Sequence, residues 1–227
     1  MALLFVLNLG VEPYERAWEL QHHLVRARQK GELDDVLILL EHEPVITLGR
    51  TGDASHILAS TEELRRLGIA AHRVERGGDV TYHGPGQLVG YPILLLEAYH
   101  LGVSDYMHAL EEVLIRTLHE FGLPAHRREG IIGVWVRESK IAALGARVER
   151  GVTYHGFALN VAPNLEHFAL IVPCGLVGAS VTSMERELGK SIAMPLVRER
   201  VVWNFGQVFG VPMEEITLAQ LHEMQKR

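Results

Sequence analysis

A glycine-rich stretch between two apolar runs constrains this chain more than any other part of its sequence. Residues 76–87 are RGGDVTYHGPGQ, with four glycines and one proline in twelve positions. Glycine permits backbone conformations closed to other residues and lets a ligand approach the main chain. A β-prone run, 69–74, precedes the stretch and an apolar run, 88–96, follows it, so we expect a loop held between two strands.

Such a loop would aim three side chains into a pocket, namely Arg76, Tyr82 and His83. The alternative is a tight hairpin in which these polar side chains only satisfy one another.

Composition limits the classes of protein to consider. With 227 residues, 48% of them hydrophobic, and no linker-like run, the chain is expected to form a single domain over residues 1–227. A net charge of -6 without a long Lys/Arg block argues against a nucleic-acid partner. The absence of a long apolar run and of a basic leader argues against a membrane and predicts a cytoplasmic protein.

Metal and disulfide chemistry are also disfavoured. The one cysteine, Cys174, excludes an intrachain disulfide and any zinc site with more than one cysteine ligand. The thirteen histidines show no His-Glu-x-x-His spacing, so no metal site is expected.

Periodicity predicts a mixture of helices and strands. Helical spacing begins at Tyr14 and ends at Gly31, and a second helix is expected to start at a Ser104 cap and end before Gly122. Further helix signals are a capping box at residues 60–63, Pro195 in a first turn and a Thr217 cap. Strands are expected at 1–9, 36–40, 45–48, 131–136, 141–148 and 152–161, the last three joined by hairpin turns. The fold class predicted is α+β, a mixed β-sheet with packed helices.

A short internal echo links two parts of the chain. The residues VERG and VTYHG at 74–77 and 80–84 recur at 148–151 and 152–156. If the two copies lie on neighbouring strands, the His83-Gly84 and His155-Gly156 pairs would wall one cavity. The alternative is a coincidence of β-forming residues that end in turns.

Two residues are candidates for covalent chemistry. Cys174 lies between a proline and a glycine, where a loop would present it as a nucleophile; the blander interpretation is a small buried hydrophobic residue. Lys140 starts the run KIAALG, and an ammonium in an apolar setting would favour a nearby thiolate and shuttle a proton. The alternative for Lys140 is a strand-end lysine that extends to water.

Five ordered motifs resemble those of the lipoyl(octanoyl) transferases, which move an octanoyl group from acyl carrier protein to lipoyl domains. The match spans about residues 36–185 and comprises TLGR at 47–50, RGGDVTYHGPGQLVGYP at 76–92, KIAALG at 140–145, HGFALNV at 155–161, and PCG at 173–175 followed by VTS at 181–183.

The resemblance implies a fold similar to the catalytic domain of biotin and lipoate protein ligases. It implies Cys174 as the acyl-thioester nucleophile and Lys140 as its catalytic partner, with no cofactor and no ATP. The implied substrate-binding residues are Arg76, Gly77, Gly78, Asp79, Val80, Thr81, Tyr82, His83, Ala143, Leu144, Gly145, Gly156, Phe157 and Ala158. The implied partners in protein lipoylation are octanoyl-acyl carrier protein as donor, and lipoyl domains of 2-oxoacid dehydrogenase E2 subunits and the glycine cleavage H protein as acceptors.

Two other classes remain open. An ATP-dependent lipoate or biotin ligase would share the fold but would need an adenylate site and no reactive thiol. A non-enzymatic acyl-binding module would need a pocket but neither Cys174 nor Lys140.

Overall fold

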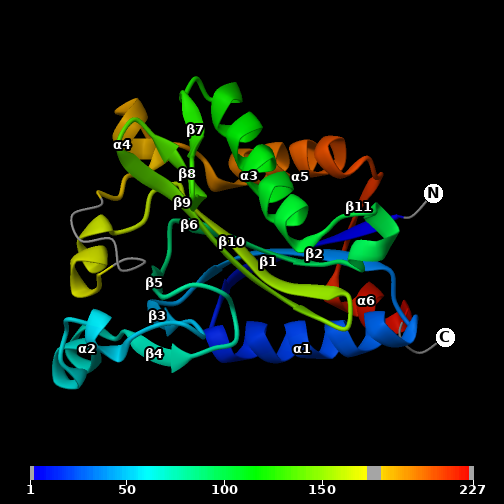
Figure 1. Cartoon of the computed structure of the whole chain (residues 1–227), viewed down its shortest axis with the longest axis horizontal. Coiled ribbons are helices and arrows are strands. Elements are labelled where there is room, and N and C mark those ends of the chain that lie inside the picture. The colour runs from blue at the N-terminus through cyan, green and yellow to red at the C-terminus, as the bar shows by residue number, and fades with distance from the viewer. Residues whose placement is uncertain (1–2, 173–179, 225–227) are drawn as a thin grey trace.

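An eight-stranded mixed sheet forms the centre of the protein (Figure 1). The computed structural model describes residues 3–172 and 180–224. Across the sheet the strands are β11 (Met213–Ile216), β1 (Leu4–Glu12), β2 (Asp35–His42), β6 (Gln87–Ile93), β10 (Val152–Asn160), β9 (Ser139–Glu149), β8 (Ile131–Val136) and β7 (Ala125–Arg128). β1 runs parallel to both β11 and β2, and the remaining neighbours are antiparallel.

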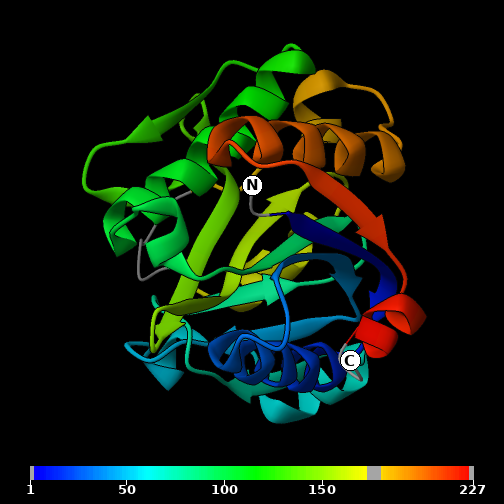
Figure 2. The same cartoon turned by 90° about the vertical axis from the view of Figure 1, so that its right-hand side faces the viewer.

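Helices cover both faces of this sheet, as Figure 2 also shows. One face packs against α3 (Val103–Glu120) and α5 (Met194–Phe209), and the other against α1 (Tyr14–Lys30) and α6 (Leu218–Met224). β2 is buried on both sides because its apolar side chains alternate: Leu37 and Leu39 face α3, whereas Ile38 and Leu40 face α1. Two separate apolar cores therefore sandwich the sheet.

A smaller sheet holds the glycine-rich stretch against the large one. Its strands are β4 (Ala70–Arg73), β3 (Val45–Leu48) and β5 (Val80–His83), and it packs with α2 (Thr61–Leu67) and a short 3-10 helix, Leu165–Leu170. The remaining helix, α4 (Met184–Leu188), begins at a Ser183 cap. The expected loop is thus interrupted by a strand, β5, which pairs with β3.

The predicted fold class is confirmed, together with many element boundaries. The β8–β9 and β9–β10 connections are tight turns, with φ of 51° at Arg137, 48° at Arg150 and 82° at Gly151. The Ser60 side chain accepts a hydrogen bond from Glu63 N, as a capping box requires. The expected Ser104 cap is wrong, because α3 begins at Val103 with Gly102 as its N-cap and no side-chain cap.

None of the helices in the described part of the chain is long and apolar enough to cross a membrane.

Gly90 on β6 gives a test of how tightly the large sheet is packed. A Cβ at this position would lie 2.2 Å from the Phe157 ring on the neighbouring β10. We expect Gly90→Ala to lower the free energy of unfolding by about 1–3 kcal/mol, since the ring must leave its place. Gly10→Ala is the matched control, because nothing lies within 4 Å of its added Cβ. Urea unfolding of both variants measures the difference; equal stability would contradict the packing argument.

Candidate active site

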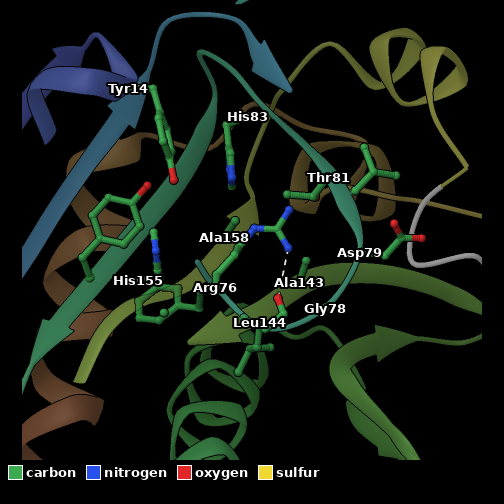
Figure 3. A pocket seen from close by; sticks show the side chains of 16 residues that line it. Tyr14, Arg76, Gly78, Asp79, Thr81, His83, Ala143, Leu144, His155 and Ala158 are labelled. Atoms are coloured by element: carbon green, nitrogen blue, oxygen red, sulfur yellow. Dashed lines mark hydrogen bonds between the residues drawn. The ribbon is translucent and has the colours of Figure 1, made fainter. Parts of the chain in front are cut away.

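A cavity opens where the glycine-rich stretch crosses the large sheet, and Figure 3 shows the side chains around it. We call it the inner cavity. Its walls come from α1, the 76–79 segment, β5, β6, β9 and β10. It is lined by Tyr14, Arg76, Gly77, Gly78, Asp79, Val80, Thr81, His83, Tyr91, Ala143, Leu144, Gly145, His155, Gly156, Phe157 and Ala158.

The structure brings nearly all of the expected substrate-binding residues together around this cavity. The exception is Tyr82, whose ring packs against Phe168 and whose hydroxyl lies 2.8 Å from His167 Nδ1. Cys174 lies outside the described residues.

Among the described residues, Arg76 is the one charged side chain that is buried in the inner cavity wall, at 8% exposure. Its Nη2 donates to Thr47 O at 2.7 Å and to Thr47 Oγ1 at 2.9 Å, and its Nη1 donates to Gly77 O at 3.1 Å. The 76–78 backbone therefore curls around the side chain of Arg76. The turn after β3 packs so closely that a Cβ on Gly49 would lie 2.2 Å from Gly78 O. Glycine is therefore needed at position 49 for the close approach of the two backbones.

Two buried histidines near this wall carry fixed tautomers. His42 Nδ1 lies 3.0 Å from Glu12 O, which only accepts, so Nδ1 carries the proton and Nε2 accepts from Tyr91 Oη at 2.6 Å. Gln87 donates its amide to Tyr82 O and to Asn160 Oδ1, so its oxygen accepts from His83 Nδ1 at 2.7 Å. His83 is thus left with an acceptor Nε2.

Burial holds both of these rings neutral. It lowers the pKa of His42 from 6.5 to about 4, and it lowers the pKa of His83 well below the ordinary value. This end of the cavity therefore presents neutral polar groups rather than charges.

His155 shares the inner cavity with His83, but the two copies of the internal echo are not on neighbouring strands: β5 belongs to the small sheet and β10 to the large one. Gly156 also lines it, but Gly84 does not. The interaction with His155 Nε2, 3.8 Å away, lowers the pKa of Glu75 to about 2. Tyr14 and Tyr91 are cavity residues that we did not expect: Tyr14 was assigned only to a helix face, and Tyr91 only to a buried run.

Lys140 is buried beside the cavity, at 7% exposure, on β9. Its Nζ lies 5.3 Å from the centre of the Trp135 ring and 3.5 Å from Ile132 O. A Cβ on Gly133 would lie 2.7 Å from Lys140 Cε, so only glycine leaves room for this side chain. The expected apolar setting is confirmed.

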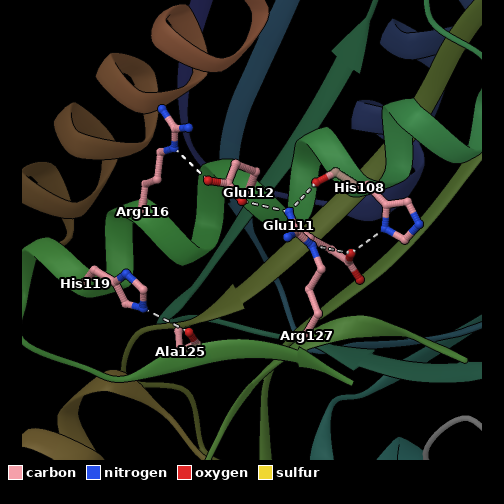
Figure 4. Close-up of polar contacts among 7 residues, drawn as sticks. All are labelled: His108, Glu111, Glu112, Arg116, His119, Ala125 and Arg127. Carbon is pink, nitrogen blue, oxygen red and sulfur yellow. Dashed lines mark hydrogen bonds and ion pairs between the residues drawn. The ribbon is translucent and has the colours of Figure 1, made fainter. Parts of the chain in front are cut away.

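A buried carboxylate on α3, that of Glu111, binds β8 beside Lys140, and Figure 4 shows its contacts with His108 and Arg127. Glu111, 1% exposed, accepts from Gly133 N at 2.8 Å and from Arg127 Nε at 3.1 Å, and lies 2.9 Å from His108 Nδ1. Glu111 thus fixes the position of Gly133 and, through it, the space available to Lys140.

A second and larger cavity, of about 860 Å³, adjoins the first. We call it the outer cavity. It is lined by Arg50, Thr51, Glu75, Gly77, Gly78, Asp79, Val103, Met107, Gly130, Ile131, Ile132, Lys140, Leu144, Gly145, Ala146, Arg147 and Val148. Lys140 therefore borders the outer cavity and not the inner one.

The neutral burial of His42 predicts a pH dependence of stability. Between pH 6.5 and about 4, His42 is protonated in the unfolded chain but neutral in the folded protein. The free energy of unfolding therefore decreases as the pH falls through this range. From pH 7.5 to 4.5 this residue should contribute about 2–3 kcal/mol to the loss. Over the same pH interval, the decrease in the free energy of unfolding should be about 2–3 kcal/mol smaller in His42→Gln than in the native protein.

Urea unfolding at the two pH values measures this change, with His126→Gln on the exposed face of β7 as the control. The same loss in His42→Gln as in the native protein would contradict a neutral buried ring.

Comparison with known proteins agrees with the fold and the motifs. The family model "Lipoyl protein ligase A/B catalytic domain" matches residues 13–206. An octanoyltransferase of Koribacter versatilis is 49% identical, over 90% of this chain and 83% of its own. One from Alkaliphilus metalliredigens is 47% identical, over 92% of this chain and 97% of its own.

Among solved structures, a putative lipoate protein ligase of T. acidophilum with bound lipoic acid has a TM-score of 0.77 at 16% identity, over 100% of this chain and 94% of its own. A lipoate-protein ligase A bound with ATP has a TM-score of 0.73 at 14% identity, over 99% of this chain and 92% of its own. These likenesses concern the fold alone. Taken with the family match and the two relatives above, they show that the chain belongs to the octanoyltransferase family, with the catalytic fold of lipoyl protein ligases A and B.

Proposed function

We propose that this protein is an acyltransferase that moves an octanoyl group from octanoyl-acyl carrier protein, through a thioester on Cys174, to a lysine of lipoyl domains. The observation that carries the proposal is the inner cavity, walled by the three expected substrate-binding segments, with the buried Lys140 lining the outer cavity that adjoins it. The acceptors are the lipoyl domains of 2-oxoacid dehydrogenase E2 subunits and the glycine cleavage H protein. The names of the relatives support octanoyl transfer.

The reaction proceeds in two acyl-transfer steps, first to Cys174 and then to the acceptor amine. The Cys174 thiolate attacks the donor carbonyl, a new S–acyl bond forms, and the carrier thiolate departs and takes up a proton. The acceptor amine then attacks this thioester, gives up a proton, and releases the Cys174 thiolate. Because a thioester is exchanged for a thioester in the first step, the acyl group stays activated without ATP.

The contacts of Lys140 support a role beside Cys174. Lys140 N donates to Ser180 O at 2.9 Å, and Thr182 N donates to Lys140 O at 3.0 Å, so the chain that follows the segment 173–179 is bound to β9. On the preceding side, Val172 N donates to His56 O at 2.8 Å. Both flanks of the segment that contains Cys174 are therefore held near the cavities.

The inner cavity offers apolar walls for an acyl chain, chiefly Leu144, Phe157 and Ala158. The six methylenes and the terminal methyl of an octanoyl chain, at about 0.8 kcal/mol each, give about 5–6 kcal/mol of gross binding free energy, before the entropic costs of association. This energy is sufficient to distinguish donors by chain length.

An intact-mass measurement tests the proposal directly. After incubation with octanoyl-acyl carrier protein and no ATP, the protein should gain one octanoyl group that hydroxylamine removes. Cys174→Ser should lose the hydroxylamine-labile adduct and essentially all transfer to a lipoyl domain, while remaining folded by circular dichroism.

The same measurement separates the rival functions. Modification only with free octanoate and ATP would identify a ligase, and reversible binding without an adduct would identify an acyl-binding module. Substantial turnover by folded Cys174→Ser would remove Cys174 as the nucleophile.

Substitution of Lys140 separates its two proposed roles. Lys140→Met keeps the apolar bulk but removes the charge, so the thiol should react with iodoacetamide at a higher pH midpoint than in the native protein. Transfer should fall by about 10²–10⁴-fold, since the proton shuttle is also lost. Lys140→Arg retains the charge but does not release a proton, so alkylation should persist while turnover fails.

Lys190→Met, at an exposed position, is the matched control and should behave as the native protein. An unchanged alkylation midpoint in Lys140→Met would exclude thiolate stabilisation by Lys140. Full turnover in Lys140→Arg would exclude proton transfer.

A further inference from the structure

The two cavities meet along a shared wall. The residues that line both of them are Gly77, Gly78, Asp79, Leu144 and Gly145. If an acyl chain fills the inner cavity, its carbonyl reaches this wall, and Lys140 lies on the outer side of it. The group that carries the acyl chain to the protein must then occupy the outer cavity. Its volume of about 860 Å³ lies within the roughly 300–1,000 Å³ of ligand sites.

The lining of the outer cavity combines apolar side chains with an excess of positive charge. Its three basic side chains are Arg50, Lys140 and Arg147. Its two carboxylates keep their charge and have other contacts: Glu75 accepts from Trp18 Nε1 at 3.1 Å and approaches His155, and Asp79 pairs with His56. The basic side chains of the lining therefore outnumber the acidic ones by one. The field inside the cavity therefore favours an anion.

The two arginines line one edge of the cavity, and the side chain of Arg147 also interacts with Tyr154. Arg50 N donates to Arg76 O at 3.1 Å, and Gly77 N donates to Ala146 O at 3.0 Å, so Arg50 and Arg147 flank the same piece of backbone. Within residues 3–172 and 180–224, neither guanidinium forms an ion pair with a carboxylate. Arg147 Nε is buried and lacks a hydrogen-bond partner in that part of the chain.

We propose that the outer cavity binds the phosphopantetheine arm of the acyl donor, with its thioester beside Lys140 and its phosphate on Arg50 and Arg147. This assignment rests on the proposed function and names the part of the donor that the protein recognises. The arm is apolar and amide-bearing along its length and ends in an anion, which matches a cavity lined by Val103, Met107 and Ile132 with arginines at one edge.

The length of the arm agrees with this placement. About thirteen bonds separate its sulfur from its phosphorus, which gives roughly 16 Å for an extended chain at about 3.6 Å for every three bonds. Lys140 and Arg147 are both on β9, seven positions apart, or about 23 Å along an extended strand. The long Arg147 side chain spans the remaining distance.

The charge also argues against the acceptor lysine as the recognised group. An amine that is protonated in water would meet three cationic and two anionic side chains in the outer cavity, so the excess of positive charge repels it. The amine must shed its proton before it attacks, so the cavity is better matched to the donor.

A pair of small donors tests the proposal. Octanoyl-4′-phosphopantetheine and octanoyl-pantetheine share the acyl chain and the thioester and differ only in the phosphate. With a purified lipoyl domain as acceptor, the native protein should show a kcat/KM about tenfold higher for the phosphorylated donor, mainly through a lower KM. High salt should reduce this ratio, because it screens the phosphate from the partly exposed arginines.

The ratio in variants identifies the residues responsible. In Arg147→Gln and Arg50→Gln the ratio should fall toward one, and in the double variant it should reach one. Arg73→Gln is the matched control: it is exposed on β4, lines neither cavity, and should keep the native ratio.

A native ratio of one, or an unchanged ratio in the double variant, overturns the proposal. If the arginine variants fail to fold, the ratio in the native protein and its salt dependence still decide. The absence of transfer from either small donor and from octanoyl-acyl carrier protein refutes the proposed function itself, and is thereby distinguished from equal use of the two small donors.

Discussion

The buried guanidinium of Arg76 requires hydrogen-bond acceptors, and the positions of these acceptors determine the shape of the candidate site. A charge at 8% exposure is tolerated only where hydrogen bonds replace water. Thr47 supplies its backbone oxygen and hydroxyl from the small sheet, and Gly77 supplies a carbonyl from the adjacent peptide. Because these acceptors lie on two separate segments, satisfying one side chain ties the small sheet to the wall of the inner cavity.

A second buried cation, Lys140, is held by a different arrangement. The Lys140 side chain contacts Gly133, the Trp135 ring and the Ile132 carbonyl. Glu111, on α3, holds this part of β8 in place through its bond to Gly133 N. A lysine with few rotamers available loses less entropy when a reaction requires it in one place. The position of Lys140 thus depends on α3 as well as on its own strand.

The fold class could be predicted from the sequence because it depends on local patterns, whereas most residues of the inner cavity were expected only from the family resemblance of the motifs. The two His-containing copies form strands whose histidines line one cavity, and the KIAALG motif forms a buried strand, as alternation and apolar density indicated. Tyr14, Tyr91 and Glu111 were missed for a common reason. Each lies in an element whose own pattern is explained by burial, and only tertiary packing shows which polar atom it directs to the site.

The pairing of β1 with β11 has a consequence for synthesis of the chain on the ribosome. β1 comprises Leu4–Glu12 and its outer neighbour comprises Met213–Ile216, so β1 is synthesised long before the strand that pairs with its outer edge. Until then, one border of an apolar strand has open backbone groups that another nascent chain could pair with. Chaperone dependence during translation should therefore be governed by this late strand closure rather than by the glycine-rich centre of the molecule.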